Sequence, residues 1–339
     1  MAVQSTSDAV ASLLNRHSHA SWLSSPIEKR LVVHPDGHQL APLFNHAWCL
    51  HVGHAQHYKY SYTEAQAPSL NHFELILLVV AKEQALNQWL LQQLALQAPT
   101  ARILIVGEKR GGVTSLVKKL PKGYAKATKL ASGNHCQLFE THVLAQPSSA
   151  DLTDDLPAFS VEWRGISATF TTLPGVFSQG RLDAGTELLL DHLPENMQGK
   201  VMDFACGSGV IGAMVARKFK IELVASDVSP MAIESTRCNW QSIGVEGDLL
   251  LADGLPSLSA SGFQFILSNP PFHTGLRTDY DIGEQFIHHA YQQLSLGGEL
   301  IIVANRFLPW PEHIQKVFGH CQTIADDGKF KVLRSKRLS

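Results

Sequence analysis

The hydrophobic and polar positions of the chain form a strand–helix–strand pattern that occurs once in each half. Short apolar runs predict buried strands, and longer mixed segments between them predict helices. The predicted elements are strands at 73–80, 102–106, 263–267 and 299–303, helices at 85–96 and 284–294, and a turn at Gly297-Gly298. Strands that alternate with helices are typical of α/β folds with parallel sheets. We therefore expect the chain to contain two copies of one α/β unit.

Further elements are predicted in the second half, where the pattern is clearest. They are a hairpin at 159–172 that turns at Arg164-Gly165, a helix near 183–193, strands at 200–204, 221–227 and 249–251, and a helix at 210–219. In the first 70 residues only a helix at 9–17 is indicated. A segment rich in proline, serine and aspartate, 146–157, has the composition of a linker. We place the domain boundary there, with domains at 1–150 and 151–339.

Composition limits the class of protein. The 339 residues are 45% hydrophobic and 17% charged, with a net charge of −2, which is typical of a soluble globular chain of about two domains. No apolar run reaches the roughly 18 residues of a membrane span, and the N-terminus does not resemble a secretory signal. The five cysteines are scattered without redox or metal-ligand spacing. A cytoplasmic protein is expected.

The loop at 205–209 has the features of a nucleotide-cofactor site. It joins a predicted strand to a predicted helix, and Gly207 and Gly209 let the backbone approach a ligand closely. The helix N-terminus adds free N–H groups. Asp227 ends the next strand, where a carboxylate can bind ribose hydroxyls, and Asp253 follows a third strand, where it can meet an adenine amino group.

Residues 207–212 also match the G-x-G-x-x-G pattern of dinucleotide-binding proteins. Asp203 argues against a dehydrogenase, because a carboxylate just before the loop repels a pyrophosphate but attracts an ammonium group. No constellation for hydride transfer follows the loop. We therefore favour S-adenosylmethionine over NAD.

The sequence Ser268-Asn-Pro-Pro-Phe-His273 follows the buried strand at 263–267. Its two prolines donate no N–H and fix the backbone, so they end the strand and hold Asn269 and Phe272 in set directions. An amide oxygen, the Pro270 carbonyl and an aromatic ring together suit a planar group that bears an NH2. We expect Asn269 and Pro270 to accept its two N–H bonds, which directs the nitrogen lone pair at a methyl donor, while Phe272 stacks on the ring.

The ordered motifs resemble those of class I S-adenosylmethionine-dependent N-methyltransferases and, more closely, the RsmC family of ribosomal RNA small-subunit methyltransferases. The segments that carry the resemblance are 106–111, 173–178, 203–209, Asp227, Asp253, 268–273, 302–305, Phe307-Leu308 and 328–332. The resemblance covers nearly the whole chain. One departure is Ala205, where many relatives carry glycine; the alanine is expected to crowd the loop and weaken cofactor binding.

The resemblance implies two tandem Rossmann-like domains, each a seven-stranded, mostly parallel sheet with helices on both faces. The first domain is expected to have lost the chemistry and to serve RNA docking or folding, and the second to be catalytic. The implied reaction is methylation of guanine N2 at position 1207 of 16S rRNA. The expected cofactor-binding positions are Asp203, Ala205, Cys206, Gly207, Gly209, Asp227, Val228, Asp253, Gly254 and Asn269, and the substrate-binding positions are Phe272, His273, Asn305 and Lys331.

Other functions remain open at this point. The same Asn-Pro-Pro motif serves enzymes that methylate another RNA guanine, DNA adenine or protein glutamine. A non-catalytic RNA-binding factor for ribosome assembly is the alternative from another class, although the intact acids and Asn269 argue against it. The expected partner is 16S rRNA within the 30S subunit, with no membrane and no metal, and the expected state is a monomer.

Two charged or titratable segments lie outside these motifs. Seven lysines and arginines and no acid occur between 109 and 129, which fits either a solvated helix face or a contact with a polyanion. Lys329, Lys331 and three more cations follow near the C-terminus. Six histidines lie between 34 and 57, but without a cysteine or carboxylate partner they do not complete a metal site.

Overall fold

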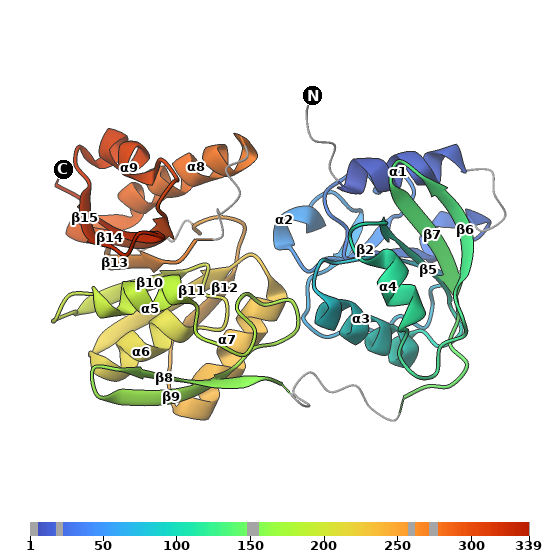
Figure 1. Ribbon diagram of the computed structural model, residues 1–339, viewed down its shortest axis with the longest axis horizontal. Helices are drawn as coiled ribbons and strands as arrows, with labels where there is room; N and C mark the ends of the chain where they lie inside the picture. The colour runs from blue at the N-terminus through green and yellow to red at the C-terminus, as the bar shows by residue number, and fades with distance from the viewer. Residues whose placement is uncertain (1–5, 18–22, 148–155, 257–261, 271–276, 339) are drawn as a thin grey trace. The chain divides into compact units, whose positions relative to one another are not determined.

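The computed structural model divides the chain into two compact units, Met1–Asp155 and Leu156–Ser339. It describes residues 6–17, 23–147, 156–256, 262–270 and 277–338 (Figure 1). None of the helices in these ranges is both long and apolar enough to cross a membrane. The boundary expected from the linker composition lies a few residues before the observed division.

The first unit contains a seven-stranded sheet in the order β3-β2-β1-β4-β5-β7-β6. Its strands are β1 (Arg30–Val33), β2 (His46–Trp48), β3 (Tyr60–Tyr62), β4 (Leu75–Val79), β5 (Arg102–Glu108), β6 (Thr128–Gly133) and β7 (Cys136–Thr141). Its α-helices are α1 (Thr6–Arg16), α2 (Val52–Ala55), α3 (Gln84–Gln97) and α4 (Val113–Lys118). The strands β3 to β5 are parallel, and β7 pairs antiparallel with both β5 and β6.

The second unit has a seven-stranded sheet in the order β12-β11-β10-β13-β14-β16-β15 and a separate hairpin, β8-β9. Its strands are β8 (Ala158–Trp163), β9 (Ile166–Thr171), β10 (Gly199–Phe204), β11 (Ile221–Asp227), β12 (Asp248–Leu251), β13 (Phe263–Ser268), β14 (Leu294–Asn305), β15 (Gln322–Asp326) and β16 (Phe330–Lys336). Its helices are α5 (Ala184–Asp191), α6 (Val210–Lys218), α7 (Pro230–Ile243), α8 (Arg277–Gln293) and α9 (Trp310–Phe318). Within the seven-stranded sheet only the pairs that involve β16 are antiparallel, and the two strands of the β8-β9 hairpin are also antiparallel to each other.

The two main sheets share one topology. When each strand is counted from the first of its sheet, both orders read 3-2-1-4-5-7-6. In both, the seventh strand is antiparallel to its two neighbours. The expectation of two α/β units of one type is confirmed, and so is the expected fold class.

The core of the second unit lies on both faces of its sheet, because successive residues of a strand point to opposite sides. Val201 belongs to a core cluster with α5, α6 and the β8-β9 hairpin. Its neighbour Met202 belongs to a second cluster with α8 and α9. Figure 1 shows α8 and α9 on the other side of β13 and β14 from α5 and α6. This three-layer arrangement leaves the carboxyl ends of the parallel strands at one edge of the sheet.

Two predicted element boundaries differ from the structure. The turn predicted at Gly297-Gly298 is an irregularity inside the long strand β14, where the pairing with β13 changes register. The φ of 80° favours glycine at Gly297, and a Cβ on Gly298 would lie 2.6 Å from the Phe263 carbonyl oxygen, so packing requires glycine there. Helix α8 begins before the predicted start at 284. The predicted hairpin turn is confirmed, with positive φ at both Arg164 and Gly165.

Candidate active site

Two neighbouring strand ends bring the predicted cofactor loop and the Asn-Pro segment together. Phe204 ends β10, Ser268 ends β13, and these two residues are paired in the parallel register. The Ser268 hydroxyl also donates a 2.7 Å hydrogen bond to the Phe204 carbonyl. Ala205 and Asn269 are therefore the first residues beyond two joined strands. Ligands of doubly wound sheets bind beyond such carboxyl ends, where the strand order reverses.

The cofactor loop is held by side chains of α7. Thr236 Oγ1 donates to the Gly207 carbonyl at 3.0 Å, and Trp240 Nε1 donates to the Gly209 carbonyl at 3.0 Å. Asn239 Nδ2 donates to the carbonyls of Ser208, at 2.9 Å, and of Thr171 in β9, at 2.8 Å. These three residues were not identified from the sequence, since polar residues on a helix carry no sign of the loop they bind. The loop backbone is thereby fixed before any ligand arrives.

Gly207 and Gly209 differ in what surrounds them. Both have positive φ, 58° and 76°. A Cβ on Gly209 would lie 2.6 Å from both Thr236 Cγ2 and Trp240 Nε1, so this glycine is needed for packing. Among the described residues, no atom lies within 4 Å of a Cβ on Gly207 or on Gly254, whose φ is 84°. These two glycines leave open space, which fits a ligand that approaches the backbone closely.

Ala205 adopts a left-handed conformation with a φ of 57°. This conformation costs an alanine about 1–2 kcal/mol, whereas glycine adopts it freely. The departure noted from the sequence therefore coincides with a strained position. Its effect on cofactor binding stays a prediction.

Asp203 lies entirely beneath the loop. Its side chain has no exposed surface, and its Oδ2 accepts a 2.8 Å hydrogen bond from the Gly212 N–H in the first turns of α6. Its Oδ1 has no hydrogen-bond partner in the described part of the chain. Burial raises the pKa of Asp203 to about 7, and the nearby Asp227 adds to this increase. The expected attraction of an ammonium group by Asp203 stays a prediction, because the carboxylate does not reach the surface.

Asp227 connects the end of β11 to the glycine loop. Its Oδ2 accepts from the Gly207 N–H at 3.0 Å, and its Oδ1 accepts from the Ser229 N–H at 2.9 Å. Burial raises the pKa of Asp227, and these backbone donors oppose the increase. Each carboxylate oxygen can accept a second hydrogen bond. The position at a carboxyl strand end fits the predicted contact with ribose hydroxyls.

The other predicted cofactor positions lie along the same edge. Asp253 is exposed just after β12, and Val228 is half-buried just after β11. Cys206 is buried, and its Sγ lies 3.3 Å from Thr236 Oγ1. Burial raises the pKa of the Cys206 thiol well above its usual value, so this cysteine is a neutral packing residue rather than a nucleophile.

Asn269 is oriented by the N-terminus of α5. Its Nδ2 donates to Asp183 Oδ2 at 2.9 Å and to Thr186 Oγ1 at 3.0 Å. Asp183 is the N-cap of α5, where the same Oδ2 accepts from the N–H groups of Gly185 and Thr186. A carboxylate only accepts hydrogen bonds, so the amide must turn its NH2 toward Asp183. Among the described residues Asn269 Oδ1 accepts no hydrogen bond, which leaves it available to a substrate donor.

The remaining predicted catalytic and substrate positions are partly outside the described residues. Pro270 is described and buried, whereas Phe272 and His273 lie outside the described ranges. Asn305 ends β14 and is half-buried, and Lys331 pairs with Ala304 across the β14-β16 ladder. Because β14 neighbours β13, both residues belong to the same edge of the sheet as Asn269. Their contact with a substrate stays a prediction.

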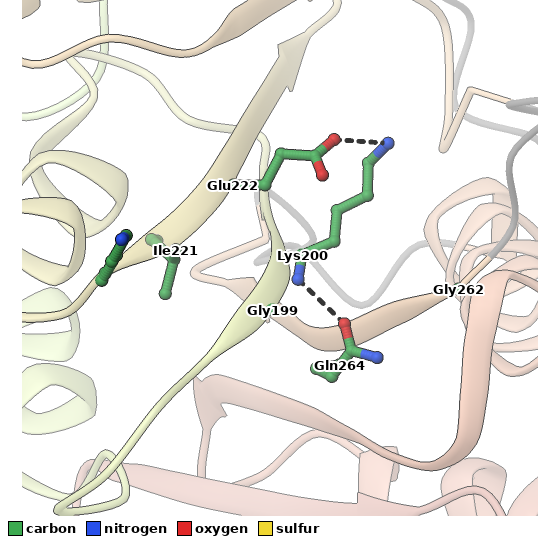
Figure 2. Close-up of a pocket in the computed structure, with 7 residues that line it drawn as sticks. Gly199, Lys200, Ile221, Glu222, Gly262 and Gln264 are labelled. Carbon is green, nitrogen blue, oxygen red and sulfur yellow. Dashed lines mark hydrogen bonds and ion pairs between the residues drawn. The ribbon is translucent and has the colours of Figure 1, made fainter.

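The opposite edge of this sheet carries a separate open depression of roughly 600 Å³ (Figure 2). It lies at the amino ends of β10, β11 and β13 and includes Lys200, Glu222 and Gln264. Lys200 Nζ lies 3.0 Å from a Glu222 carboxylate oxygen, and the Lys200 N–H donates to Gln264 Oε1 at 2.8 Å. The side chains of Lys200, Glu222 and Gln264 thus make polar contacts within this depression, and the predicted site residues that the structure describes are at the other edge.

The carboxyl edge of the sheet in the first unit carries neither the glycine loop nor the Asn-Pro-Pro-Phe sequence. His34 follows β1 at the place where the glycine loop follows β10, and its φ is 58°. Burial lowers the pKa of the His34 imidazole, which lies 3.3 Å from the Val79 carbonyl. The Asn87 side chain bonds both the N–H and the carbonyl of Ala81 just after β4.

The histidines of the first unit do not form a metal site in the described part of the chain. The rings of His51 and His54 stack with their centroids 4.1 Å apart, and no group of three potential metal ligands is found among the described residues.

Comparisons with known proteins cover both units. The methyltransferase small domain model matches residues 167–334, and the model of its N-terminal domain matches residues 35–156. The ribosomal RNA small subunit methyltransferase C of Idiomarina loihiensis is 44% identical over 332 residues, which is 96% of this chain and 98% of that protein. This chain belongs to the ribosomal RNA small subunit methyltransferase C family.

A further member supports this assignment to the methyltransferase C family, and a solved structure shows the same fold. The protein of the same name from Pseudomonas paraeruginosa is 36% identical over 302 residues and covers 86% of this chain and 89% of its own. The fold is similar to that of the T. thermophilus 16S rRNA N2 G1207 methyltransferase, solved in complex with AdoMet and guanosine. That match has a TM-score of 0.76, 20% identity and coverage of 94% of this chain and 91% of the other. The resemblance inferred from the motifs is confirmed.

Proposed function

We propose that the protein transfers a methyl group from S-adenosylmethionine to the exocyclic N2 of a guanine in 16S rRNA. The nucleotide corresponding to G1207, named for the T. thermophilus protein, is the proposed target. Membership of the methyltransferase C family supports the reaction class and the RNA. The observation that carries the proposal is the orientation of Asn269 beside the glycine loop, with its amide oxygen accepting no hydrogen bond from the described residues.

The residues of the carboxyl edge fit the cofactor. The open space at Gly207 and Gly254 suits the close approach of a nucleoside, and Asp227 can accept from the ribose hydroxyls. Asp203 supports the loop from below through Gly212 rather than by contact. When bound, S-adenosylmethionine supplies an electrophilic methyl group on its sulfonium.

The acceptor amine is held by Asn269 and Pro270. The Asn269 Oδ1 and the Pro270 carbonyl accept the two N–H bonds of the guanine amino group, which directs the nitrogen lone pair toward the methyl donor. These two oxygens also stabilise the positive charge that develops on the nitrogen. The methylated nitrogen then loses a proton readily, so no strong base is needed. Most of the acceleration comes from positioning. A paired guanine has to leave its stack first, at a cost of a few kcal/mol.

The first unit supplies an RNA contact in this proposal. The seven cations of the segment 109–129 are all exposed, and no ion pair of theirs is among those described. They are Lys109, Arg110, Lys118, Lys119, Lys122, Lys126 and Lys129. Such a surface attracts phosphates without reading sequence. The loss of both motifs from this unit fits docking or folding support rather than chemistry. We place the protein in the cytoplasm, as a monomer acting on the 30S subunit.

The test is a map of methylated guanines in 16S rRNA from cells with and without the protein. The expected result is one N2-methylguanine that disappears with the protein and returns with the wild-type gene. In parallel, transfer of a labelled methyl group is measured to naked 16S RNA, 30S particles, DNA and protein. Transfer confined to DNA or protein contradicts the proposed substrate. Failure to bind S-adenosylmethionine in calorimetry favours a non-catalytic assembly factor instead.

A further inference from the structure

Phe307 has the most exposed aromatic ring in the described part of the chain, at 73%. It lies in a turn just after β14 that is closed by a 3.1 Å hydrogen bond from the Leu308 N–H to the Asn305 carbonyl. The next apolar side chains, Leu308 and Trp310, are each only 6% exposed and belong to the core. The turn is therefore anchored on one side while the ring is held in solvent.

The turn is also fixed to the strand beside it. The Arg306 N–H donates to the Lys329 carbonyl at 2.8 Å, directly after the Asn305–Phe330 pair of the β14-β16 ladder. Phe330 is buried against the first turn of α5, where a Cβ on Gly185 would lie 3.5 Å from its ring. The same turn of α5 holds the Asp183 cap that orients Asn269. Phe307 is thus linked to the acceptor site through rigid elements.

The position of Phe307 follows from the strand register. Ser268 of β13 pairs with Ile302 of β14, so both strands run past this level to the same carboxyl edge. Asn269 follows Ser268 immediately, and the Asn305–Leu308 turn follows Ile302 by only a few residues. Asn269 and the Asn305–Leu308 turn therefore lie at the same edge of the sheet, after two neighbouring strands.

The charges around the turn are mixed, with two cations and two carboxylates. Arg306 and Lys329 are exposed beside it. Arg306 lies 3.5 Å from Asp326, whereas Asp327 directs its carboxylate at the backbone N–H groups of Lys329 and Phe330. These backbone donors lower the pKa of Asp327. The Lys329 ammonium lies 4.7 Å from the centre of the Phe330 ring, and its charge also contributes to the lowered pKa of Asp327.

We propose that Phe307 stacks on the base of a nucleotide adjacent to the target guanine, with Arg306 and Lys329 beside the neighbouring phosphates. This inference rests on the proposed function, because it takes single-stranded rRNA as the occupant. Single-stranded RNA is bound by aromatic rings that stack on unpaired bases and by cations along the backbone. The ring would hold the strand in place while its neighbour is turned toward Asn269.

An exposed apolar residue by itself needs no explanation. Leu296 provides the comparison, since it is 72% exposed but lies near the amino end of β14, at the opposite edge of the sheet from Asn269. If exposure alone mattered, truncation of either side chain would have the same effect. The stacking contact requires that truncation of Phe307, but not of Leu296, weakens RNA binding.

The experiment compares Phe307→Ala, Phe307→Leu, Phe307→Tyr and Leu296→Ala with the wild type. Affinity is measured for a 16S rRNA transcript, and the single-turnover rate of methyl transfer is measured at saturating transcript. Loss of one base stack weakens RNA binding by about 5- to 150-fold. We expect this loss in the alanine and leucine variants, near-normal binding in the tyrosine variant and in Leu296→Ala, and unchanged affinity for S-adenosylmethionine in all four.

The outcomes separate this inference from the proposed function. If the wild type methylates the transcript and Phe307→Ala binds it equally well, the stacking contact is wrong while the function stands. Equal losses in Phe307→Ala and Leu296→Ala also overturn it, as does a leucine variant that binds like the wild type. A wild-type protein that transfers no methyl group to RNA contradicts the proposed function itself. Because Phe307 is exposed, melting temperatures close to that of the wild type are expected for its variants.

Discussion

The Asp183 carboxylate accepts the Asn269 amide NH2 at 2.9 Å while it caps helix α5. The two residues are 86 positions apart in the chain. One oxygen, Oδ2, serves both roles, so the start of the helix and the direction of the amide are fixed together. The Asn269 Oδ1 is thereby the amide atom that is turned away from Asp183.

Replacement of Asp183 tests whether this orientation matters for turnover. In Asp183→Ala the amide can rotate, and misplacement of a reacting group by about 1 Å costs up to about 100-fold in rate. Loss of the cap costs about 1 kcal/mol of stability as well. Asp183→Ser restores a helix cap, but its shorter side chain does not reproduce the bond to Asn269. We expect kcat to fall in both variants while the melting temperature recovers only in the serine variant. Turnover at the wild-type level in Asp183→Ser would refute the positioning role.

The two glycines of the loop are expected to respond differently to alanine. Gly207→Ala places a methyl group in open space, so its stability should fall only by the left-handed strain of about 1–2 kcal/mol. Its affinity for S-adenosylmethionine should fall by at least about tenfold, which corresponds to about 1.4 kcal/mol. Calorimetry and thermal unfolding measure the two effects separately.

Gly209→Ala is the matched variant. Its added methyl group meets Thr236 and Trp240 at 2.6 Å, and overpacking of this kind costs about 1–3 kcal/mol beyond the strain. A larger loss of melting temperature than in Gly207→Ala is therefore expected. The assignment of Gly207 to the ligand space is wrong if Gly207→Ala binds the cofactor normally.

Asp203 should make the stability of the ligand-free protein depend on pH. Its pKa is about 7 in the folded protein, above its ordinary value of 3.8. The folded state therefore binds more protons than the unfolded state between about pH 4 and 7, and stability falls as the pH rises through this window. A tenfold change in an acid constant is worth about 1.4 kcal/mol, so the effect is on the order of a few kcal/mol.

Asp203→Asn removes the titration and keeps an oxygen for the Gly212 N–H. The melting temperatures of the variant and the wild type, compared at pH 5 and pH 8, should show the wild type losing stability relative to the variant at the higher pH. A constant difference between the two proteins across this range would show that Asp203 does not titrate there.

The basic segment should set the salt dependence of RNA binding. Lys122→Glu with Lys126→Glu reverses two exposed charges without touching a helix. Each lost phosphate contact lowers the slope of log K against log salt concentration by about 0.7–0.9. Binding to a 16S rRNA transcript should weaken and its salt dependence should flatten. The control is Lys59→Glu with Lys82→Glu, which makes the same change of charge on exposed lysines outside the segment. Equal behaviour of the two double variants would show that the segment is only solvated surface.

The sheets of the second unit could be predicted because its strands are apolar runs bounded by glycine, proline or acids. The strands β10, β11 and β13 were each located this way. The glycine loop follows β10, Asp227 ends β11 and Asn269 follows β13. In the first unit the strands β1, β2 and β3 are three or four residues long, too short for a periodic pattern. Their existence could be inferred only from the likeness of the two halves.

The supporting contacts of the site could not be read from the chain. Asp183, Thr236, Asn239 and Trp240 are ordinary residues at a helix start or on a helix face, and their partners lie 29 to 86 positions away. The sequence indicated that Asp203 lies near the ligand, but not that a strand would bury it completely. Burial depends on the layers above and below the sheet, which no local pattern describes.

The most direct test of the central claim is the single-turnover rate of methyl transfer by Asn269→Ala, at saturating S-adenosylmethionine and RNA. Removal of one hydrogen-bonding group directed at developing charge, an oxyanion-hole donor, costs about 100- to 1,000-fold in kcat. We expect a fall of this size even with the cofactor at saturation, and a melting temperature close to that of the wild type. Methyl transfer by Asn269→Ala at the wild-type rate would contradict it.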